Sequence, residues 1–153
     1  MKKSFVKNLI IAGIVSLVGA TLVYARVLIG ETAKSAFTFR PAALTSTSQG
    51  TAVDRLNYQS VLAVLDVGAV TGTSPTMDCK LQSSATSGGT YTDISGATFT
   101  QVTASNARQD KSVDLSPVNR FIRGLCAIGG TTPSFTASLI FILGEPGTRG
   151  TLP

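Results

Sequence analysis

The chain has 153 residues, of which only 14% are charged, and it contains neither Trp nor His. A chain of this length has room for one domain with a substantial hydrophobic core. Its formal net charge is +5, but three lysines lie within the first seven residues, and from Arg26 onward 10 basic residues stand against 8 acidic ones. Because the remaining basic residues are scattered and not interleaved with aromatics, we expect no nucleic-acid partner.

The N-terminus reads as a segment separate from the folded domain. Residues 1–8 are basic, and residues 9–25 form an apolar run without a charge that ends in Val23-Tyr-Ala25. A basic start, an apolar run and small residues at the cleavage positions are typical of a secretory signal peptide, which would leave a chain that begins at Arg26. Export would place that chain in the periplasm or at the cell surface.

Two other interpretations of this apolar run stay open. Seventeen uncharged residues are also just enough to span a bilayer, so a membrane contact through residues 9–25 is possible. Ala12, Ser16 and Ala20 recur every four residues, as in the pairing of helices through small side chains. We therefore expect an apolar helix over residues 1–25 that is cleaved, retained as an anchor, or buried in an assembly.

Residues 26–50 are predicted to form an N-terminal arm and a first strand. Phe37 and Phe39 alternate with polar residues, which is a strand signal. Pro41 is expected to end this strand because proline cannot donate a hydrogen bond to a ladder. The following residues, up to Gly50, read as a loop.

The rest of the domain is organised around residues 56–102. Residues 60–67 and 76–82 alternate between apolar and other side chains and are separated by a Gly- and Pro-containing stretch at 68–75, which predicts two strands joined by a loop. The first run is apolar on nearly both faces and is typical of a central strand. The second has one polar face, as expected of an antiparallel neighbour that packs on one side.

Further strands are predicted toward the C-terminus. Residues 90–94 and 97–103 read as short strands joined by a tight turn at Ser95-Gly96. After a polar loop at 104–110, a short strand over residues 111–115 should turn Val113 and Leu115 inward. Two core strands are expected on either side of a turn at 129–133, and they cover residues 119–128 and 134–143.

The predicted architecture is all-β. We expect a single antiparallel β-sandwich or jelly roll of about eight strands, with its core over residues 51–143. The apolar helix precedes it, and an extended Gly- and Pro-rich tail at 144–153 follows it. We find no internal sequence repeat.

The sequence offers little that could carry catalysis. The absence of His removes the commonest general base and metal ligand. The eight carboxylates are dispersed, and no Gly-x-Ser-x-Gly motif or phosphate-binding loop occurs. We therefore expect no enzyme, no catalytic residue, no metal and no cofactor.

The two cysteines, Cys79 and Cys126, lie in predicted core strands. They either form a disulfide after export or remain buried free thiols that behave as small apolar residues. Sequence alone leaves both alternatives open, because it does not show the pairing geometry.

Two arginines are candidates for an interface. Arg120 and Arg123 begin a predicted core strand, and alternation places Arg123 on the same face as Phe121 and Leu125. An arginine on an apolar face either reaches the rim of the sheet, pairs across strands with a carboxylate such as Asp66 or Asp78, or projects into a subunit interface.

Four short motifs resemble those of small virion proteins of tailed bacteriophages. In chain order they are Tyr58-Gln-Ser60, Lys80-Leu-Gln-Ser-Ser84, Tyr91-Thr-Asp-Ile-Ser-Gly-Ala97 and Arg120-Phe-Ile-Arg123. The resemblance covers roughly residues 54–143. It implies a β-sandwich or jelly-roll protein of the capsid surface, either a decoration (cement) protein or another minor structural protein.

Such a role implies protein partners. We expect the major capsid protein or other virion subunits as partners, and a homo-oligomer. Extended arms at residues 26–40 and 144–153 would become ordered on docking, so Phe37, Phe39 and Arg149 are candidate interface residues together with Arg120 and Arg123.

The N-terminal apolar segment departs from this family pattern, because head proteins assembled in the cytoplasm do not need it. It favours a virion with a membrane or an exported protein of prophage origin. The alternative function is a secreted or membrane-anchored β-sandwich binding module at the bacterial cell surface.

Overall fold

A computed structural model of the chain describes residues 33–146, which form an all-β domain and contain no helix. This confirms the all-β prediction. The predicted N-terminal helix, with Ala12, Ser16 and Ala20, lies outside the described residues, as do residues 147–153 of the tail with Arg149. No helix in the described part of the chain could cross a bilayer.

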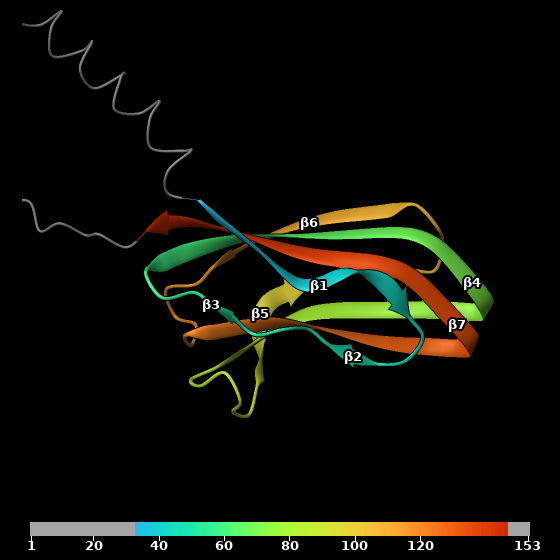
Figure 1. Cartoon of the computed structure of the whole chain (residues 1–153), viewed down its shortest axis with the longest axis horizontal. Helices are drawn as coiled ribbons and strands as arrows, with labels where there is room; N and C mark the ends of the chain where they lie inside the picture. Colours follow the sequence, from blue (N-terminus) through green and yellow to red (C-terminus); the bar gives the residue numbers. More distant parts are fainter. Residues whose placement is uncertain (1–32, 147–153) are drawn as a thin grey trace, which may run out of the picture. The chain divides into compact units, whose positions relative to one another are not determined.

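Seven strands hydrogen-bond into one antiparallel sheet (Figure 1). Two of them, β4 and β7, are far longer than the rest. The strands are β1 (Lys34–Leu44), β2 (Ser48–Gln49), β3 (Val53–Asp54), β4 (Tyr58–Ser84), β5 (Thr92–Thr98), β6 (Ala107–Asp114) and β7 (Phe121–Pro146).

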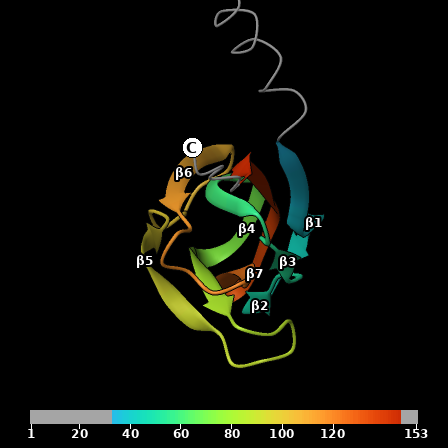
Figure 2. The ribbon, with the colours of Figure 1, turned by 90° about the vertical axis from the view of Figure 1, so that its left-hand side faces the viewer.

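The long strands β4 and β7 form a ribbon that folds back on itself. They pair along almost their whole length, from Tyr58 opposite Pro146 to Ser84 opposite Phe121. Both bend at the same place, so the ribbon forms two facing layers (Figures 1 and 2). Layer A contains β1, the second half of β7, the first half of β4 and β6. Layer B contains β2, β3, the first half of β7, the second half of β4 and β5.

The bend is built from a short repeat that the sequence analysis missed. Gly72-Thr-Ser-Pro75 in β4 and Gly130-Thr-Thr-Pro133 in β7 lie side by side, and both glycines have positive φ, 114° and 110°. A Cβ on Gly72 would lie 2.9 Å from Cα of Pro133, and one on Gly130 would lie 2.9 Å from Cα of Pro75. Each glycine therefore fits against the proline of the other strand.

This bend corrects the predicted strand boundaries. Residues 68–75 and 129–133 were expected to be loops between separate strands, but they lie inside β4 and β7. The Gly and Pro residues produce register shifts within a continuous ladder, because the two strands bend together. The number of strands is therefore seven rather than about eight.

Other boundaries also differ from the predictions. β1 continues past Pro41 to Leu44, because its pairing with β7 shifts register around this proline and requires no N–H donor there. Ser95-Gly96 is not a hairpin turn but a bulge within β5, where Gly96 has a φ of 73°. β6 begins at Ala107, inside the predicted polar loop.

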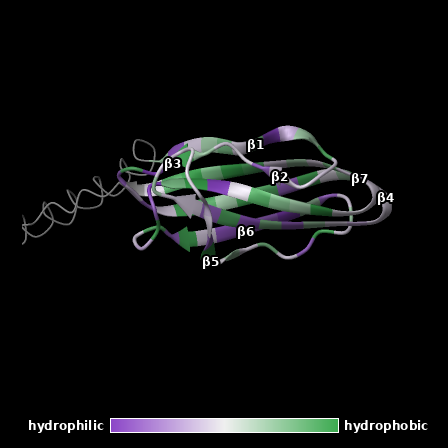
Figure 3. Ribbon diagram, turned by 90° about the horizontal axis from the view of Figure 1, so that it is seen from below, coloured by the Kyte–Doolittle hydropathy of each residue, from purple (hydrophilic) through white to green (hydrophobic). Residues whose placement is uncertain are grey.

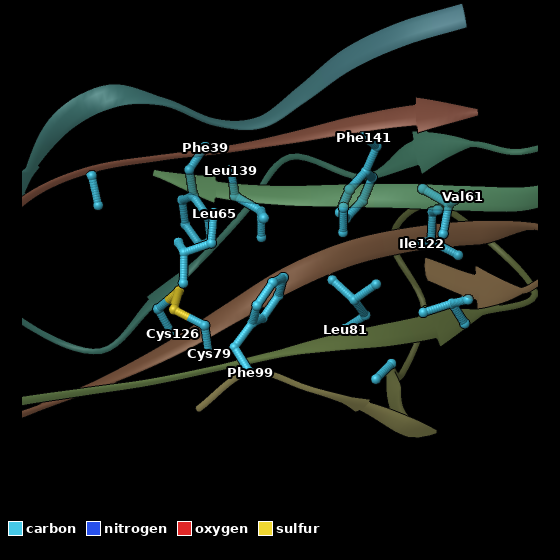
Figure 4. Close-up of a cluster of buried hydrophobic side chains, with 14 of the residues drawn as sticks. Phe39, Val61, Leu65, Cys79, Leu81, Phe99, Ile122, Cys126, Leu139 and Phe141 are labelled. Carbon is cyan, nitrogen blue, oxygen red and sulfur yellow. A yellow bond between two sulfur atoms is a disulfide. The ribbon is translucent and has the colours of Figure 1, made fainter. Parts of the chain in front are cut away.

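The core lies between the two layers and follows the predicted alternation. Val61, Ala63, Leu65 and Val67 of β4 are all buried, at 1% exposure or less. They face side chains of the other layer, such as Leu81 (Figure 4). Hydrophobic and hydrophilic residues alternate along the strands (Figure 3). Full burial of such a side chain contributes about 1.5 to 3 kcal/mol.

Polar contacts tie the layers together at both sides of the core. On one side, the Thr38 hydroxyl accepts a hydrogen bond from the Gly124 N–H (2.9 Å) and donates one to the Thr51 carbonyl (3.0 Å). On the other side, the Gln109 side chain donates to the Thr100 carbonyl (2.9 Å) and accepts from its N–H (2.8 Å). These contacts close the ring of strands seen in Figure 2.

Candidate interaction surfaces

Layer A carries apolar side chains on its outer face as well as on its core face. Phe37 of β1, Leu62 of β4 and Ile142 of β7 are 39%, 38% and 37% exposed. Leu62 lies opposite Ile142, and the half-buried Val64 lies opposite Ile140, which in turn lies opposite Phe37. We call these residues the outer apolar patch: Phe37, Leu62, Val64, Ile140 and Ile142.

The patch explains why residues 60–67 are apolar on nearly both faces. This part of β4 is an interior strand of layer A, between β7 and β6, as predicted. Its second apolar face does not enter the core, however, but reaches the surface with Leu62. Contiguous exposed apolar side chains of this kind mark surfaces for protein or membrane contact.

Charged residues border the outer apolar patch. The Arg40 guanidinium lies 5.7 Å from the centroid of the Phe37 ring. On the opposite border, Asp110 of β6 is the neighbour of Val64 and forms an exposed ion pair with Arg108 at 3.5 Å. The patch therefore has a cation at its β1 border and the Arg108–Asp110 ion pair at its β6 border.

The phenylalanines proposed for an interface differ in position. Phe37 lies in the outer apolar patch, whereas Phe39 is only 8% exposed and belongs to the core. Simple alternation placed both on one face. A register shift between them turns Phe39 inward. Phe39 is therefore a core residue and not part of an exposed interface.

Layer B carries a polar network on its outer face, and Arg123 is its centre. The Arg123 side chain is half-buried, as are Phe121 and Leu125 on the same face. Its guanidinium donates to Oε1 of Gln82 (3.1 and 3.2 Å) and to Oε1 of Gln49 (2.8 Å). It also stacks on the Tyr91 ring, 3.9 Å from the centroid.

The network continues from Gln82 to β5. The Gln82 amide donates to Asp93 (2.8 Å), and Lys80 forms an ion pair with the same carboxylate (2.6 Å). The hydrogen bond from Lys80, followed by the one from Gln82, lowers the pKa of Asp93 below its usual value. Neither Asp66 nor Asp78, the carboxylates considered as partners, bonds Arg123. Gln82 and Tyr91 belong to two of the four motifs that carry the resemblance, but nothing in the sequence showed that they meet Arg123. No sequence signal pointed to Gln49, since β2 is brought to this network only by the fold.

Arg120 lies outside this network and pairs with Asp54 of β3. The distance from its guanidinium to the carboxylate is 2.7 Å. The Asp54 carboxylate also accepts a hydrogen bond from the Leu56 N–H (2.9 Å). The bond from Arg120, followed by that from Leu56, lowers the pKa of Asp54 to about 2, and the same pairing raises the pKa of Arg120.

Cys79 and Cys126 lie opposite each other in adjacent strands of layer B, and a disulfide joins them. Their Cα atoms are 4.1 Å apart, and both side chains are buried in the core (Figure 4). Of the two alternatives left open by the sequence, the structure therefore contains the disulfide. Within residues 33–146, no group of three or more Cys, His, Asp or Glu side chains could hold a metal ion.

Comparisons with known proteins give only distant likenesses. No protein-family model matches the chain. Nor does any curated protein match it. Among solved structures, the chain is similar to the SPBc2 prophage-derived protein YomS, with 14% identity over 72% of this chain and 92% of that chain, and a TM-score of 0.42. It is also similar to a protein of the disulfide-linked pili that form Bacillus endospore appendages, with 17% identity over 74% of this chain and 88% of that chain, and a TM-score of 0.36. Likenesses at this level identify neither a family nor a function.

Proposed function

We propose that this chain is a non-enzymatic structural protein of a virion, and that it decorates the capsid by binding capsid subunits through the outer apolar patch. The patch itself supports this proposal. It brings together three of the four large hydrophobic side chains that are exposed in the described residues, Phe37, Leu62 and Ile142.

The physical basis is the burial of apolar surface against a partner. Phe37, Leu62 and Ile142 each leave more than a third of their surface in water, and each gains about 25 cal/mol for every Å² of apolar surface that a partner covers. The patch lies on two long paired strands that are fixed by a buried core on their other face. Little conformational entropy is therefore lost when a partner binds there.

A pair of lysine substitutions tests the proposal. In Leu62→Lys/Ile142→Lys, two charges enter the patch while the core face of β4 and β7 keeps its side chains. We expect a loss of about tenfold or more in the amount of protein bound to purified particles, because a buried unpaired charge is costly at an interface.

The matched control is Leu56→Lys. Leu56 is the fourth exposed large hydrophobic, 52% exposed, and lies between β3 and β4 outside the patch. This variant should bind particles as the wild type does. Equal binding of the patch variant and the wild type, with circular dichroism showing that both are folded, would contradict the proposal.

The disulfide favours a second candidate function, an exported binding module at the bacterial cell surface. Disulfides such as Cys79–Cys126 persist mainly in oxidising compartments outside the cytoplasm. In this case the chain would be found in the envelope or outside the cell and not in particles. Fractionation of producing cells, followed by detection of the protein in each fraction, distinguishes the two candidates.

A further inference from the structure

The edges of the two layers are protected to different degrees. In layer B the edge strands are β2 and β3, which have only two residues each, and β5, which is interrupted by a bulge. Short strands and bulges are common devices against edge-to-edge association. In layer A, by contrast, the edge strand β6 pairs with β4 over eight residues without any register shift.

Both edges of layer A have backbone available for pairing. Among the described residues, the backbone of β6 bonds only to β4, and the first part of β1, Lys34 to Phe37, bonds only to β7. The first backbone bond on the other side of β1 comes from Thr51 to Thr38. Beside this stretch of β1, an open groove of about 510 Å³ lies between β1 and residues 51–54.

The directions of the two edge strands suit an association between copies. Neighbours in the order β1, β7, β4, β6 are all antiparallel, so β1 and β6 run in opposite directions. When a second copy is placed beside the first by a sideways shift, its β6 lies antiparallel to β1. That is the arrangement in which a regular ladder forms.

The register of layer A predicts which side chains would meet. Phe37, Ile140, Val64 and Asp110 form one row across the four strands. A sideways shift without stagger therefore places Asp110 of the next copy beside Phe37. The Arg40 guanidinium already lies over the Phe37 ring, so it would meet that carboxylate.

A symmetric contact between two β1 edges is less favourable. In an antiparallel pair centred on Phe37, Lys34 of each copy would lie opposite Arg40 of the other. Like charges placed directly opposite each other are destabilising in a sheet. Charge therefore favours contact between unlike edges over contact between two copies of β1.

We propose that copies of this chain associate head to tail, with β1 of one copy paired to β6 of the next. Layer A then becomes a continuous sheet across copies, and the outer apolar patches lie in one strip. A contact between unlike surfaces is open-ended and builds a filament, or a ring if the rotation closes. This association goes beyond the proposed function, because it needs no capsid.

Charge reversal at the two edges tests the proposal on the full-length chain in nonionic detergent. Wild type should show an average mass that rises with concentration in analytical ultracentrifugation. Arg40→Glu and Asp110→Arg should each weaken association by about tenfold or more, because each places like charges together at the contact. Asp78→Arg, an equivalent change on the outer face of layer B, is the control and should associate as wild type does.

Mixing the two variants gives the decisive result. Arg40→Glu places a negative charge on β1, which would meet the positive charge that Asp110→Arg places on β6. The unchanged edges of the two variants carry Asp110 and Arg40, so they are complementary as well. An equimolar mixture should therefore recover association as an alternating copolymer, and so should the double variant Arg40→Glu/Asp110→Arg by itself.

Three outcomes would overturn the head-to-tail contact. The first is a wild-type chain that stays monomeric up to about 1 mM, the upper end of weak specific association. The second is association that is unchanged in both single variants, since the contact would then lie elsewhere. The third is a mixture that remains unassociated although both variants are folded by circular dichroism.

Discussion

The buried disulfide constrains the chain at the residue level. Cys79 and Cys126 are 47 residues apart in sequence and connect β4 to β7 within layer B. A cross-link of this separation lowers the entropy of the unfolded chain, which stabilises the fold by about 2 to 4 kcal/mol. The segment it encloses contains β5 and β6, so its loss affects both layers.

Reduction of Cys79–Cys126 should therefore lower the free energy of unfolding by about 2 to 4 kcal/mol. Reduction leaves both sulfur atoms in place, so the effect of the cross-link is separated from that of core volume. Urea denaturation followed by circular dichroism, with and without reductant, gives the difference. Identical midpoints, after mass spectrometry has verified reduction, would show that the disulfide does not stabilise the fold.

The Asp54–Arg120 pair makes stability depend on pH. Pairing lowers the pKa of Asp54 from 3.8 to about 2, so the folded chain favours the ionised carboxylate. This stabilisation is fully present above about pH 4 and is lost as the pH falls toward 2, because the unfolded chain binds the proton first. The pair is exposed, so its contribution is about 1 kcal/mol or less.

Substitution Asp54→Asn measures this contribution. At pH 6 the variant should be less stable than the wild type, by about 1 kcal/mol or less. At pH 2 the difference should be smaller, since the wild-type carboxyl, with a pKa of about 2, is then about half protonated. Urea denaturation at the two pH values provides the test, and an equal difference at both would refute the assignment.

At the level of elements, the bend in β4 and β7 decides the architecture. Gly72 and Gly130 have positive φ and lie against the backbone of the opposite strand. An added Cβ would strain the backbone and also collide with atoms that cannot move independently. Among the described glycines, these two combine a positive φ with close contact to backbone atoms of another strand.

Alanine substitutions test this dependence. Gly72→Ala and Gly130→Ala should each destabilise the domain by about 2 to 4 kcal/mol. Gly96→Ala is the matched control, because Gly96 also has a positive φ but an added Cβ there would have no atom beyond its chain neighbours within 4 Å. This substitution should cost about 1 kcal/mol. If all three variants lost similar stability, close contact at the bend would not be the cause.

The sequence predicts the strands of this domain better than their connections. Alternation at Val61, Ala63, Leu65 and Val67 shows which face is buried, because burial acts on each side chain locally. Gly72 and Pro75 indicate that the strand is interrupted. Glycine and proline are typical both of a loop and of a bend that two paired strands share, so they do not distinguish the two. Only the pairing with Gly130 and Pro133 distinguishes them, and that contact is distant in sequence.

The candidate surfaces were predictable only in part. The two-faced apolar pattern of residues 60–67 contained the signal for the outer apolar patch, although it was assigned to the core. Phe37 was identified as a candidate, but Phe39 was wrongly placed beside it because a bulge does not show in the pattern. The partners of Arg123, Gln49 and Gln82, come from other strands. Gln82 lies in a motif that carries the resemblance, but no pattern in the sequence shows that it meets Arg123.

At the level of the whole molecule, the two outer faces differ in character. Layer B presents the polar network around Arg123. Layer A presents the outer apolar patch, and within residues 33–146 the backbone of β6 and of the first part of β1 pairs on one side only. The polar side chains on the outer face of layer B thus bond to one another. Layer A, by contrast, retains apolar surface and backbone groups that a partner could bind. This asymmetry is what we expect of a protein that works by assembly.

The central claim is that the chain is a component of assembled particles. The most direct measurement is intact mass spectrometry, without reductant, of the native protein from purified particles and from the host envelope fraction. The account predicts the chain in the particles, two hydrogens lighter than its reduced mass because of Cys79–Cys126. Absence from particles, with the protein confined to the envelope fraction, would contradict it.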